Sequence, residues 1–587
     1  MNKTLRQAQS LKQNTDFLKN TFRKAVFPCM LSTLSANINV FVDGMLVGNR
    51  IGIDALAAIN LSLPLYLLFC VGGSFFASGT AINAARAIGK NDSAKSQEYY
   101  CTCITGLFTL SILIMVIGLL FRNPLVAFLC SDKNIQPFVM QYVVITLIGT
   151  LPKIMIYAPF WYLRLDGKNM EVTAMMAVMS VGNVLLDVLF VYVWDMGVFG
   201  AGLASVIATT VACVMGMVCL LRKDGTFHFR PFCYKKITEW KEIVEAGMPA
   251  ALNNLLSAIR ILFINSILMN YGGGAMVAVF TAVTGIAGFG ECITLGIPQA
   301  ASAMLGVYSG EKDNGSCSLL VKLQWMTGCV YTCIFLIACM AAAGVIQDIY
   351  RLEDSLLAPL VWMAVSVFPA LFCNIVSGYY NMAKKTIWAN GIIFSRVIVM
   401  TYIGIRLAVY WNWPVYSFLL FAELATITVW FAATGINHRL HTEETRFLLM
   451  NTVLEQRGRI LNFSVGAVTE EICNASERIM TFCETNGMNQ KKTMRLQLAI
   501  EEIMTLICQV NEEKGDRNLT FDLRAYSLDG ITGIRIRYNG VQFNPFDGTT
   551  NEDDRYMGIH MIRKMIEKSV YLRTFGVNTL QVILREE

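Results

Sequence analysis

Charged residues are scarce in this chain of 587 residues. They make up 15% of it and hydrophobic residues 55%, whereas an average soluble domain is about 25% charged. The scarcity is uneven, because about 40 of the charged residues lie from Arg439 onward. The composition therefore excludes a wholly soluble protein. It predicts a long apolar region, a domain boundary near residue 438 and a globular tail.

Other patterns are also missing. The 17 cysteines show no paired spacing, which argues against a disulfide framework or a zinc site and favours a reducing compartment. The absence of a G-x-x-x-x-G-K-[ST] loop argues against an ATP-driven pump. The net charge of +6 is the sum of about +8 on the apolar region and about −2 on the tail, as expected for basic loops beside a cytoplasmic leaflet. We expect membrane lipids as partners, no nucleic acid and no cofactor.

Long apolar runs dominate the first 437 residues. A run of about 20 mostly apolar residues can cross a membrane as a helix. Twelve such runs are expected near residues 25–48, 55–85, 101–121, 138–165, 172–194, 201–221, 246–270, 275–308, 319–345, 357–382, 387–410 and 414–436. Lysines and arginines gather in alternate connections, as at Arg86, Arg164 and Lys384, which predicts a cell-membrane protein with both termini in the cytoplasm.

The apolar region contains an internal repeat. A shift of about 221 residues superposes Ala25, Pro28 and Leu31 on Ala246, Pro249 and Leu252, and Gly89 on Gly310. An offset of six helices predicts parallel repeats around a central cleft. The fold class is thus an all-α polytopic membrane protein of two six-helix lobes, followed by an α/β sandwich domain. The expected parts are a cytoplasmic segment (1–24), an amino-terminal lobe (25–221), a cytoplasmic connecting loop (222–245), a carboxyl-terminal lobe (246–437), a linker (438–455) and a cytosolic domain (456–587).

Five segments resemble the multidrug and toxic compound extrusion (MATE) family: VDGMLVGNRIGIDALAA, GTAINAARAIGKND, RLDGKN, GNVLLDVLF and GVFGAGLASVIA. The resemblance covers about residues 20–437. It implies a V-shaped bundle of two lobes that exports organic, often cationic or amphipathic compounds by cation-coupled antiport.

Carboxylates inside the amino-terminal lobe are the candidates for ion coupling. A charge at mid-helix costs roughly 2.5–3.5 kcal/mol on insertion scales, so the presence of Asp43 and Asp187 within predicted spans calls for a structural or functional explanation. Asn183 lies one helical turn before Asp187, and Ser205 offers a hydroxyl. These oxygens suit a proton or a sodium ion, with Na⁺ held by Asp43, Asn183 and Asp187. The MATE resemblance implies the same cation site. The alternatives are hydrogen-bonded helix packing and neutralisation by Lys153.

The carboxyl-terminal lobe carries a balanced set of two cations and two anions, namely Arg260, Glu291, Arg396 and Glu423. Structural ion pairs are the simplest interpretation, and contact with a cationic substrate is the alternative. Some MATE members have a second cation site in this lobe, but our alignment places Ser257 and Ala370 at its carboxylate positions. We expect that second site to be absent.

The tail from about residue 456 changes to mixed periodicity. We predict strands at 460–465, 518–526, 531–538, 569–575 and 578–585, with helices at 467–485, 490–512 and 554–568, forming a mixed sheet. The order resembles the ATP-binding domain of histidine kinases and anti-sigma factors. Its nucleotide site would comprise Glu502, Leu506, Tyr538, Gly540 and Gly558. Leu506 and Tyr538 stand where the resemblance implies a metal-binding asparagine and a base-binding aspartate. We therefore predict a degenerate domain that is not an enzyme. Its expected role is to regulate transport or to dock a cytosolic protein.

The sequence thus predicts a secondary antiporter that exports organic, amphipathic or cationic compounds in exchange for H⁺ or Na⁺. Two alternatives stay open. One is a lipid-linked saccharide flippase of the same superfamily. The other is a transporter-like membrane sensor that controls its cytosolic tail.

Overall fold

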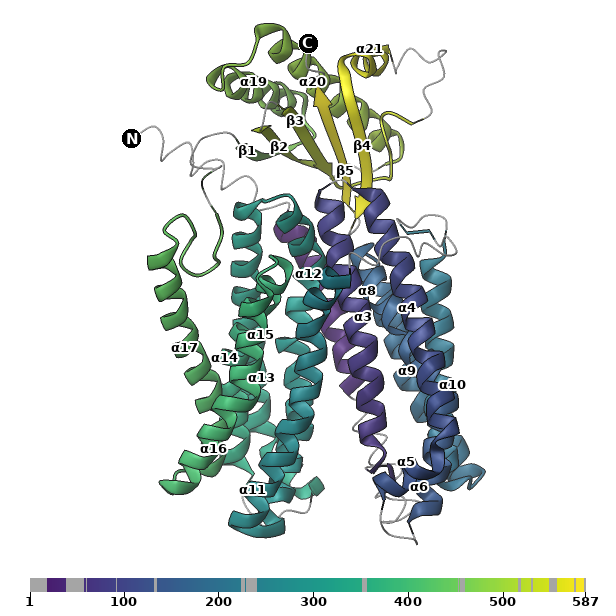
Figure 1. Ribbon diagram of the computed structural model, residues 1–587. Helices are drawn as coiled ribbons and strands as arrows, with labels where there is room; N and C mark the ends of the chain where they lie inside the picture. Colours follow the sequence, from purple (N-terminus) through teal and green to yellow (C-terminus); the bar gives the residue numbers. More distant parts are fainter. Residues whose placement is uncertain are drawn as a thin grey trace. The chain divides into compact units, whose positions relative to one another are not determined.

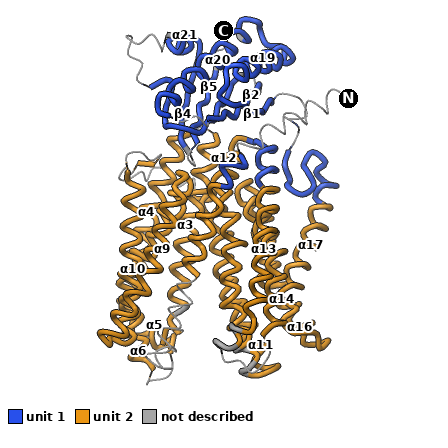
Figure 2. Tube along the Cα trace, turned by 180° about the vertical axis from the view of Figure 1, so that it is seen from behind, with its two compact units in different colours: residues 1–23, 312–320, 437–587 blue, residues 24–311, 321–436 orange. Residues whose placement is uncertain are grey.

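The structure is a computed structural model. It describes residues 18–37, 58–59, 61–90, 92–130, 135–222, 227–228, 240–350, 356–451, 453, 460–515, 519–528, 531–547, 557–574 and 577–584. The chain forms two compact units (Figure 2). Residues 24–311 and 321–436 make up the membrane unit, and residues 1–23, 312–320 and 437–587 make up the tail unit.

The membrane unit is built of helices (Figure 1). A helix over residues 18–37 opens the amino-terminal lobe. The same lobe contains α3 (Leu63–Gly89), α4 (Ser93–Leu120), α5 (Arg122–Leu129), α6 (Gln136–Ile148), α7 (Thr150–Met155), α8 (Tyr157–Leu165), α9 (Asn169–Asp187), the π-helix η1 (Val188–Val193) and α10 (Gly197–Leu220). The carboxyl-terminal lobe contains α11 (Trp240–Thr294), α12 (Gly296–Gly310), α13 (Asn314–Tyr350), α14 (Leu357–Met382), α15 (Thr386–Phe394), the π-helix η3 (Ser395–Met400), α16 (Thr401–Tyr410), the 3₁₀ helix η4 (Val415–Ser417) and α17 (Phe418–Leu440).

Within the described residues, ten helices are long and apolar enough to cross a membrane, and one bent pair adds an eleventh candidate. The bent pair, Gln136–Ile148 with Thr150–Leu165, turns by 59° where the sequence predicts one span at 138–165. Gly149 and Pro152 account for the bend, because proline removes a helical hydrogen bond and clashes with the preceding turn. The first expected span, 25–48, extends beyond the described residues at position 37. The count of twelve therefore stays a prediction.

Several helices run past the boundaries that hydropathy predicts. The first described helix already includes Leu18, inside the expected cytoplasmic segment. Helix α11 begins at Trp240, so the expected connecting loop at 222–245 ends in a helical turn, and α17 continues to Leu440. Hydropathy detects only the apolar middle of a span, whereas polar first and last turns stay helical outside the hydrocarbon core. In α11 the acidic Glu242 in the first turn is favourable at a helix N-terminus.

The two lobes meet closely where α3 and α12 end. A Cβ atom added at Gly89 would lie 2.1 Å from the carbonyl oxygen of Val307, and one added at Gly310 would lie 2.4 Å from that of Arg86. Only glycine permits such an approach of two backbones. Gly89 and Gly310 are also the glycines that the 221-residue shift superposes. Repeat-related residues that pack together lie beside the axis relating the two lobes, as expected for a real duplication.

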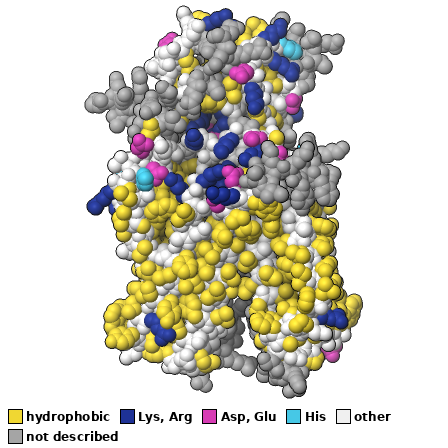
Figure 3. Space-filling model, viewed as in Figure 1, with side chains coloured by type: hydrophobic (Ala, Val, Ile, Leu, Met, Phe, Trp, Pro, Cys, Tyr) yellow, Lys and Arg dark blue, Asp and Glu magenta, His cyan; other side chains and the backbone are white. Residues whose placement is uncertain are grey.

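The surface of the membrane unit is apolar. Figure 3 shows hydrophobic side chains covering most of one face of the helices, and this face is hollowed between its two halves near its lower end. Helices α5 and α6 lie at that lower end (Figure 1). Helix α3 reaches Gly89 at the opposite end of the membrane unit. The lobes are therefore in close contact at one end and separated at the other.

The tail unit contains a five-stranded sheet in the order β1-β2-β3-β5-β4. Its strands are β1 (Ile460–Gly466), β2 (Thr520–Leu528), β3 (Ile531–Tyr538), β4 (Ile566–Thr574) and β5 (Val577–Leu584). Its helices are α19 (Thr469–Thr485), α20 (Gln490–Glu513) and α21 (Met557–Met565). All four strand pairings are antiparallel, so the prediction of a mixed sheet is wrong. The strand pattern alone does not encode the direction of pairing.

Alternation along the strands divides the tail sheet into two different faces. Phe521, Leu523, Ile534 and Ile536 pack into one hydrophobic core with the helices. The opposite face carries buried polar and charged side chains, namely Asp522, Arg524, Arg535, Arg537, Thr579 and Gln581. A buried charged face is costly unless partners lie against it.

A segment outside the sheet supplies one such partner. Asp313, in the connection before α13, belongs to the tail unit and lies 3.0 Å from the guanidinium of Arg524, with both side chains almost fully buried. The same carboxylate accepts hydrogen bonds from the backbone and the hydroxyl of Ser316, which is the pattern of a helix N-cap. The first turn of α13 is thereby fixed to strand β2.

Candidate functional site

The amino-terminal lobe holds a buried polar pair. The amide of Asn183 donates a hydrogen bond of 2.7 Å to the carboxylate of Asp187. The two side chains are 2% and 0% exposed. Their spacing of four residues places them on one face of α9, as the sequence predicts. Helix α9 ends at Asp187, where the backbone changes to the π-helix η1, a local distortion that is frequent at functional sites.

The first described helix packs along α9 beside this pair. Ser180 donates a hydrogen bond to the carbonyl oxygen of Ser35, and Thr173 donates one to that of Pro28, each at 2.7 Å. Asp43 follows this helix in the sequence and lies outside the described residues. Ser205, the fourth predicted member of the site, is half-buried on α10. The structure thus joins two of the four predicted residues directly.

The carboxyl-terminal lobe contains an ion pair between η3 and α17, formed by two of the four charged residues that the sequence singles out. The guanidinium of Arg396 lies 3.5 Å from the carboxylate of Glu423 and donates a 2.8 Å hydrogen bond to Asn374. Arg396 belongs to η3, so each of the two π-helices among the described residues lies at an ionisable residue of its lobe. Arg260 and Glu291 both belong to α11, where Arg260 is half-buried and Glu291 is exposed.

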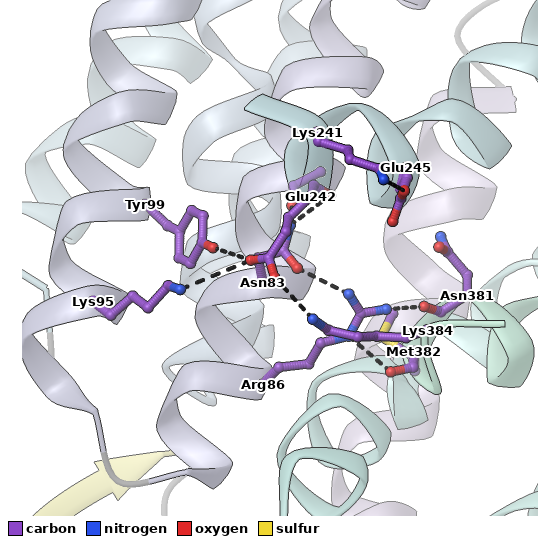
Figure 4. Close-up of polar contacts among 11 residues, drawn as sticks. Asn83, Arg86, Lys95, Tyr99, Lys241, Glu242, Glu245, Asn381, Met382 and Lys384 are labelled. Carbon is purple, nitrogen blue, oxygen red and sulfur yellow. Dashed lines mark hydrogen bonds and ion pairs between the residues drawn. The ribbon is translucent and has the colours of Figure 1, made fainter. Parts of the chain in front are cut away.

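Arg86 connects the two lobes at the closed end (Figure 4). Its side chain leaves α3, is 6% exposed and donates to the carbonyl oxygens of Met382, at 2.9 Å, and Asn381 at the end of α14. It also donates to Asn83 one turn earlier. A buried guanidinium satisfied by carbonyl oxygens of the other lobe fixes the two helix ends to each other.

Glu242 extends this network (Figure 4). From the first turn of α11 its carboxylate accepts a 2.7 Å hydrogen bond from Tyr99 of α4 and pairs with Lys384 at 3.0 Å. The amide of Asn83 donates to the carbonyl oxygen of Glu242. Helices of both lobes therefore share a single polar network, which we call the closing network: Asn83, Arg86, Tyr99, Glu242, Asn381 and Lys384.

A second layer of contacts between the lobes involves Arg164. Its guanidinium, 5% exposed, donates to the hydroxyl of Ser32 at 2.7 Å and to the amide oxygen of Gln299 on α12. Gln299 also accepts a 3.4 Å hydrogen bond from Thr33. Asn37 adds a third contact, with a donor 3.5 Å from the carboxylate of Glu291. Polar contacts between the lobes thus continue from the closed end along the first helix.

Sequence reasoning assigned the two arginines incorrectly. The positive-inside pattern placed Arg86 and Arg164 among the basic residues of the loops, yet both lie in the last turns of helices and are buried. Their presence in the segments GTAINAARAIGKND and RLDGKN is the signal that could have identified them. A rule that counts charge near span ends does not separate arginines that face the headgroups from arginines that join two lobes.

The predicted nucleotide site of the tail is largely core. Leu506 and Tyr538 are 4% and 0% exposed and belong to the hydrophobic cluster between sheet and helices. The Tyr538 hydroxyl donates to the carbonyl oxygen of Phe543, and burial raises its pKa. A Cβ atom at Gly558 would lie 2.1 Å from the carboxylate of Glu502. Gly540 has a φ of 108°, a conformation that favours glycine. Among the described residues, no group of three or more His, Cys, Asp or Glu side chains is placed to hold a metal.

Comparison with known sequences finds a family match in the amino-terminal lobe. Residues 28–193 match the protein family described as MatE. Similar curated proteins include the multidrug export protein MepA of Staphylococcus haemolyticus and the probable multidrug resistance protein YoeA of Bacillus subtilis. The chain is 25% identical to each, over 47% and 49% of its own length. The aligned part spans 60% and 64% of the length of these two relatives.

Solved structures extend the likeness to both lobes. One is an outward-facing conformation of a multidrug resistance MATE family transporter of the MOP superfamily, with a TM-score of 0.67 at 20% identity, covering 70% of this chain and 94% of that one. The Vibrio cholerae MATE transporter VcmN gives a TM-score of 0.67 at 19% identity, over 73% of this chain and 98% of that one. The chain thus resembles the MatE family over residues 28–193, and its membrane unit has the fold of the solved MATE transporters.

Proposed function

We propose that the chain is a secondary active antiporter of the cell membrane. It exports organic, amphipathic or cationic compounds in exchange for H⁺ or Na⁺. The observation that carries the proposal is the pair of Asn183 and Asp187, buried in the amino-terminal lobe of a MATE-type bundle and joined by a hydrogen bond of 2.7 Å. An acid inside a membrane bundle is a functional site by default, because its burial is costly.

Ion exchange follows from the chemistry of the pair. Binding of a proton or of Na⁺ at Asp187 neutralises the carboxylate and changes the hydrogen bonds available to Asn183. The first helix packs on the same helix through Ser35 and Pro28, so a change at Asp187 alters the surface against which it rests. An ion can shift the equilibrium between two conformations of the bundle only if it binds one of them more tightly than the other. The coupling ion supplies that difference.

The closing network acts as a gate. The basic loops predict that the end bearing Arg86 and Lys384 faces the cytoplasm. With that orientation, we propose that this conformation is closed toward the cytoplasm and open outward. Export requires the lobes to separate at that end and load a compound there. Each cycle must therefore break and remake the bonds of Arg86 and Glu242.

The tail is proposed to regulate the transporter or to dock a cytosolic protein. The contact of Arg524 with Asp313 supports regulation, because Asp313 also caps α13, a helix of the carboxyl-terminal lobe. Changes in the tail would thereby reach the first turn of that helix. A sensor that uses a transporter-like body to control its tail would use the same contact in the reverse direction.

Efflux of a fluorescent cation from cells tests the main proposal. Cells that produce the wild-type chain should retain less dye than cells that produce Asp187→Asn, whereas Asp195→Asn, which alters an exposed carboxylate near the end of the same span, should behave like the wild type. Equal efflux by Asp187→Asn and the wild type, at equal amounts of protein in the membrane, would overturn the coupling role.

A further inference from the structure

An apolar groove lies in the carboxyl-terminal lobe between α14, α16, η4 and α17. Trp362, near the start of α14, lines this groove, whereas the closing network lies at the other end of that helix. The groove has a volume of about 250 Å³. A single water molecule needs only on the order of 10–15 Å³, and packed protein interiors contain few spaces larger than that. The described side chains therefore leave room for a much larger guest molecule.

The walls of the groove are closely packed. Helices α16 and α17 meet at Gly404, where an added Cβ atom would lie 2.7 Å from Cδ1 of Phe421, so the absence of a side chain allows the two helices to approach. Beneath them, Val415 and Phe418 are buried in a hydrophobic core against which Trp362 packs. The groove is therefore preformed, as binding sites for small molecules usually are.

The groove opens on the outside of the bundle. Figure 1 and Figure 2 show α16 and α17 on the side of the carboxyl-terminal lobe that is remote from the amino-terminal lobe. Leu424 and Trp413, which line the groove, are about half exposed. Tyr410 and Trp411 are exposed as well, and the rings of Trp411 and Trp413 lie 5.0 Å apart. Exposed aromatic rings of this kind are typical of the boundary between hydrocarbon and water, so the opening of the groove faces lipid just inside that boundary.

The lining residues favour an apolar occupant. None of the described residues that line the groove carries a charge, and Ser417 supplies the one hydroxyl among them. A polar solute would lose its hydration there without gaining partners, and apolar cavities stay dry. A hydrocarbon chain inside the groove contacts protein on several sides, whereas a chain on a smooth helix surface has contacts on one side. The groove therefore offers a hydrocarbon chain more dispersion attraction than the surrounding surface does.

We propose that this groove binds an acyl chain of a membrane phospholipid and retains that lipid on the carboxyl-terminal lobe. The chain lies against the first turns of α17, and the headgroup lies beside the exposed rings of Trp411 and Trp413. The site is separate from the pair of Asn183 and Asp187, so it does not depend on the proposed export function. A lipid held in this way stays bound during purification, unlike the lipids that merely surround the bundle.

Native mass spectrometry of the full-length protein tests the assignment. The protein is extracted in a mild detergent that is then exchanged repeatedly, and the mass of each complex shows the bound phospholipids and the number of chains. The wild type should keep one phospholipid per chain. Leu424→Trp and Ser417→Phe fill the groove from α17 and from η4, and both should lose that lipid. Val429→Trp adds a similar bulk at an exposed position of α17 that does not line the groove, and it should keep the lipid.

A second measurement needs no variant that fills the groove. One equivalent of a phospholipid brominated along its acyl chain should quench the tryptophan fluorescence of the wild type, and replacing both Trp362 and Trp413 by phenylalanine should remove much of that quenching. Equal quenching in the two proteins would overturn the site. So would retention of the phospholipid by both groove-filling variants. A wild-type dimer that these variants dissociate would show that a second copy of the chain, and not a lipid, occupies the groove.

Discussion

Replacement of Gly310 by alanine should open the closed end of the bundle. A Cβ atom at this position would lie 2.4 Å from the carbonyl oxygen of Arg86, whereas ordinary contacts of a Cβ begin near 3.4 Å. The backbones of α12 and α3 must therefore move apart by about 1 Å, and overpacking of this kind typically costs about 1–3 kcal/mol. The clashing atoms belong to different lobes, so the clash raises the free energy of the closed state alone. A shift of that size changes the ratio of the two states by about 5-fold to 150-fold.

Distance measurement between the lobes is the direct assay. Spin labels are placed at Ala94 and Ile387, which are exposed on opposite lobes. Non-natural residues carry the labels because the chain has 17 cysteines. Gly310→Ala should convert much of the short-distance population to a longer one. Gly378→Ala is the matched control, since a Cβ atom there meets nothing within 4 Å. An unchanged distribution in Gly310→Ala would refute the reasoning.

Three further predictions concern the gate and the tail. Arg86→Gln removes charge-assisted hydrogen bonds to the other lobe, each worth about 1.5–3 kcal/mol. Efflux should therefore fall, and the spin labels at Ala94 and Ile387 should show a larger open population. A distance distribution equal to that of the wild type would contradict the role of the closing network as a gate. Asp313→Asn removes the carboxylate that lies 3.0 Å from the buried Arg524, and breaking a buried ion pair typically costs about 3–5 kcal/mol. Limited proteolysis of the full chain should therefore cut the tail unit sooner, and adding Arg524→Gln should recover part of the loss. Equal digestion rates would argue against a stabilising role of this contact. Magnesium-ATP should leave the melting temperature of the full chain unchanged, because Leu506 and Tyr538 are core residues; micromolar binding by calorimetry would contradict the degenerate site.

Local periodicity predicts the elements of this chain well. Apolar runs indicate the membrane helices, and the spacing of Asn183 and Asp187 predicts their shared face, which the hydrogen bond between them confirms. The repeat offset predicts that Gly89 and Gly310 occupy equivalent places. Each of these features depends on residues within one element, or on the comparison of one element with its repeat. They can therefore be predicted directly from the sequence.

Features that depend on contacts between distant elements were predicted poorly. The sequence pattern shows that Arg86 and Arg164 are basic residues near span ends, but not that carbonyl oxygens and amides of the other lobe accept their hydrogen bonds. It likewise indicates five strands in the tail, but not that all of them pair antiparallel. The charge balance of the carboxyl-terminal lobe predicts two ion pairs, whereas the structure forms one, between Arg396 and Glu423. Whether two such residues or strands come into contact depends on the distance between elements that are far apart in the sequence, and a local sequence pattern does not contain that distance.

Transport by the purified chain in vesicles, with proton and sodium gradients imposed separately, tests the central claim most directly. The account predicts that one of the two gradients drives accumulation of a fluorescent cation, that the matching ionophore abolishes it, and that Asp187→Asn abolishes the response to the gradient while the protein still binds the dye. Accumulation that ignores both gradients, or that proceeds equally in Asp187→Asn, would contradict it.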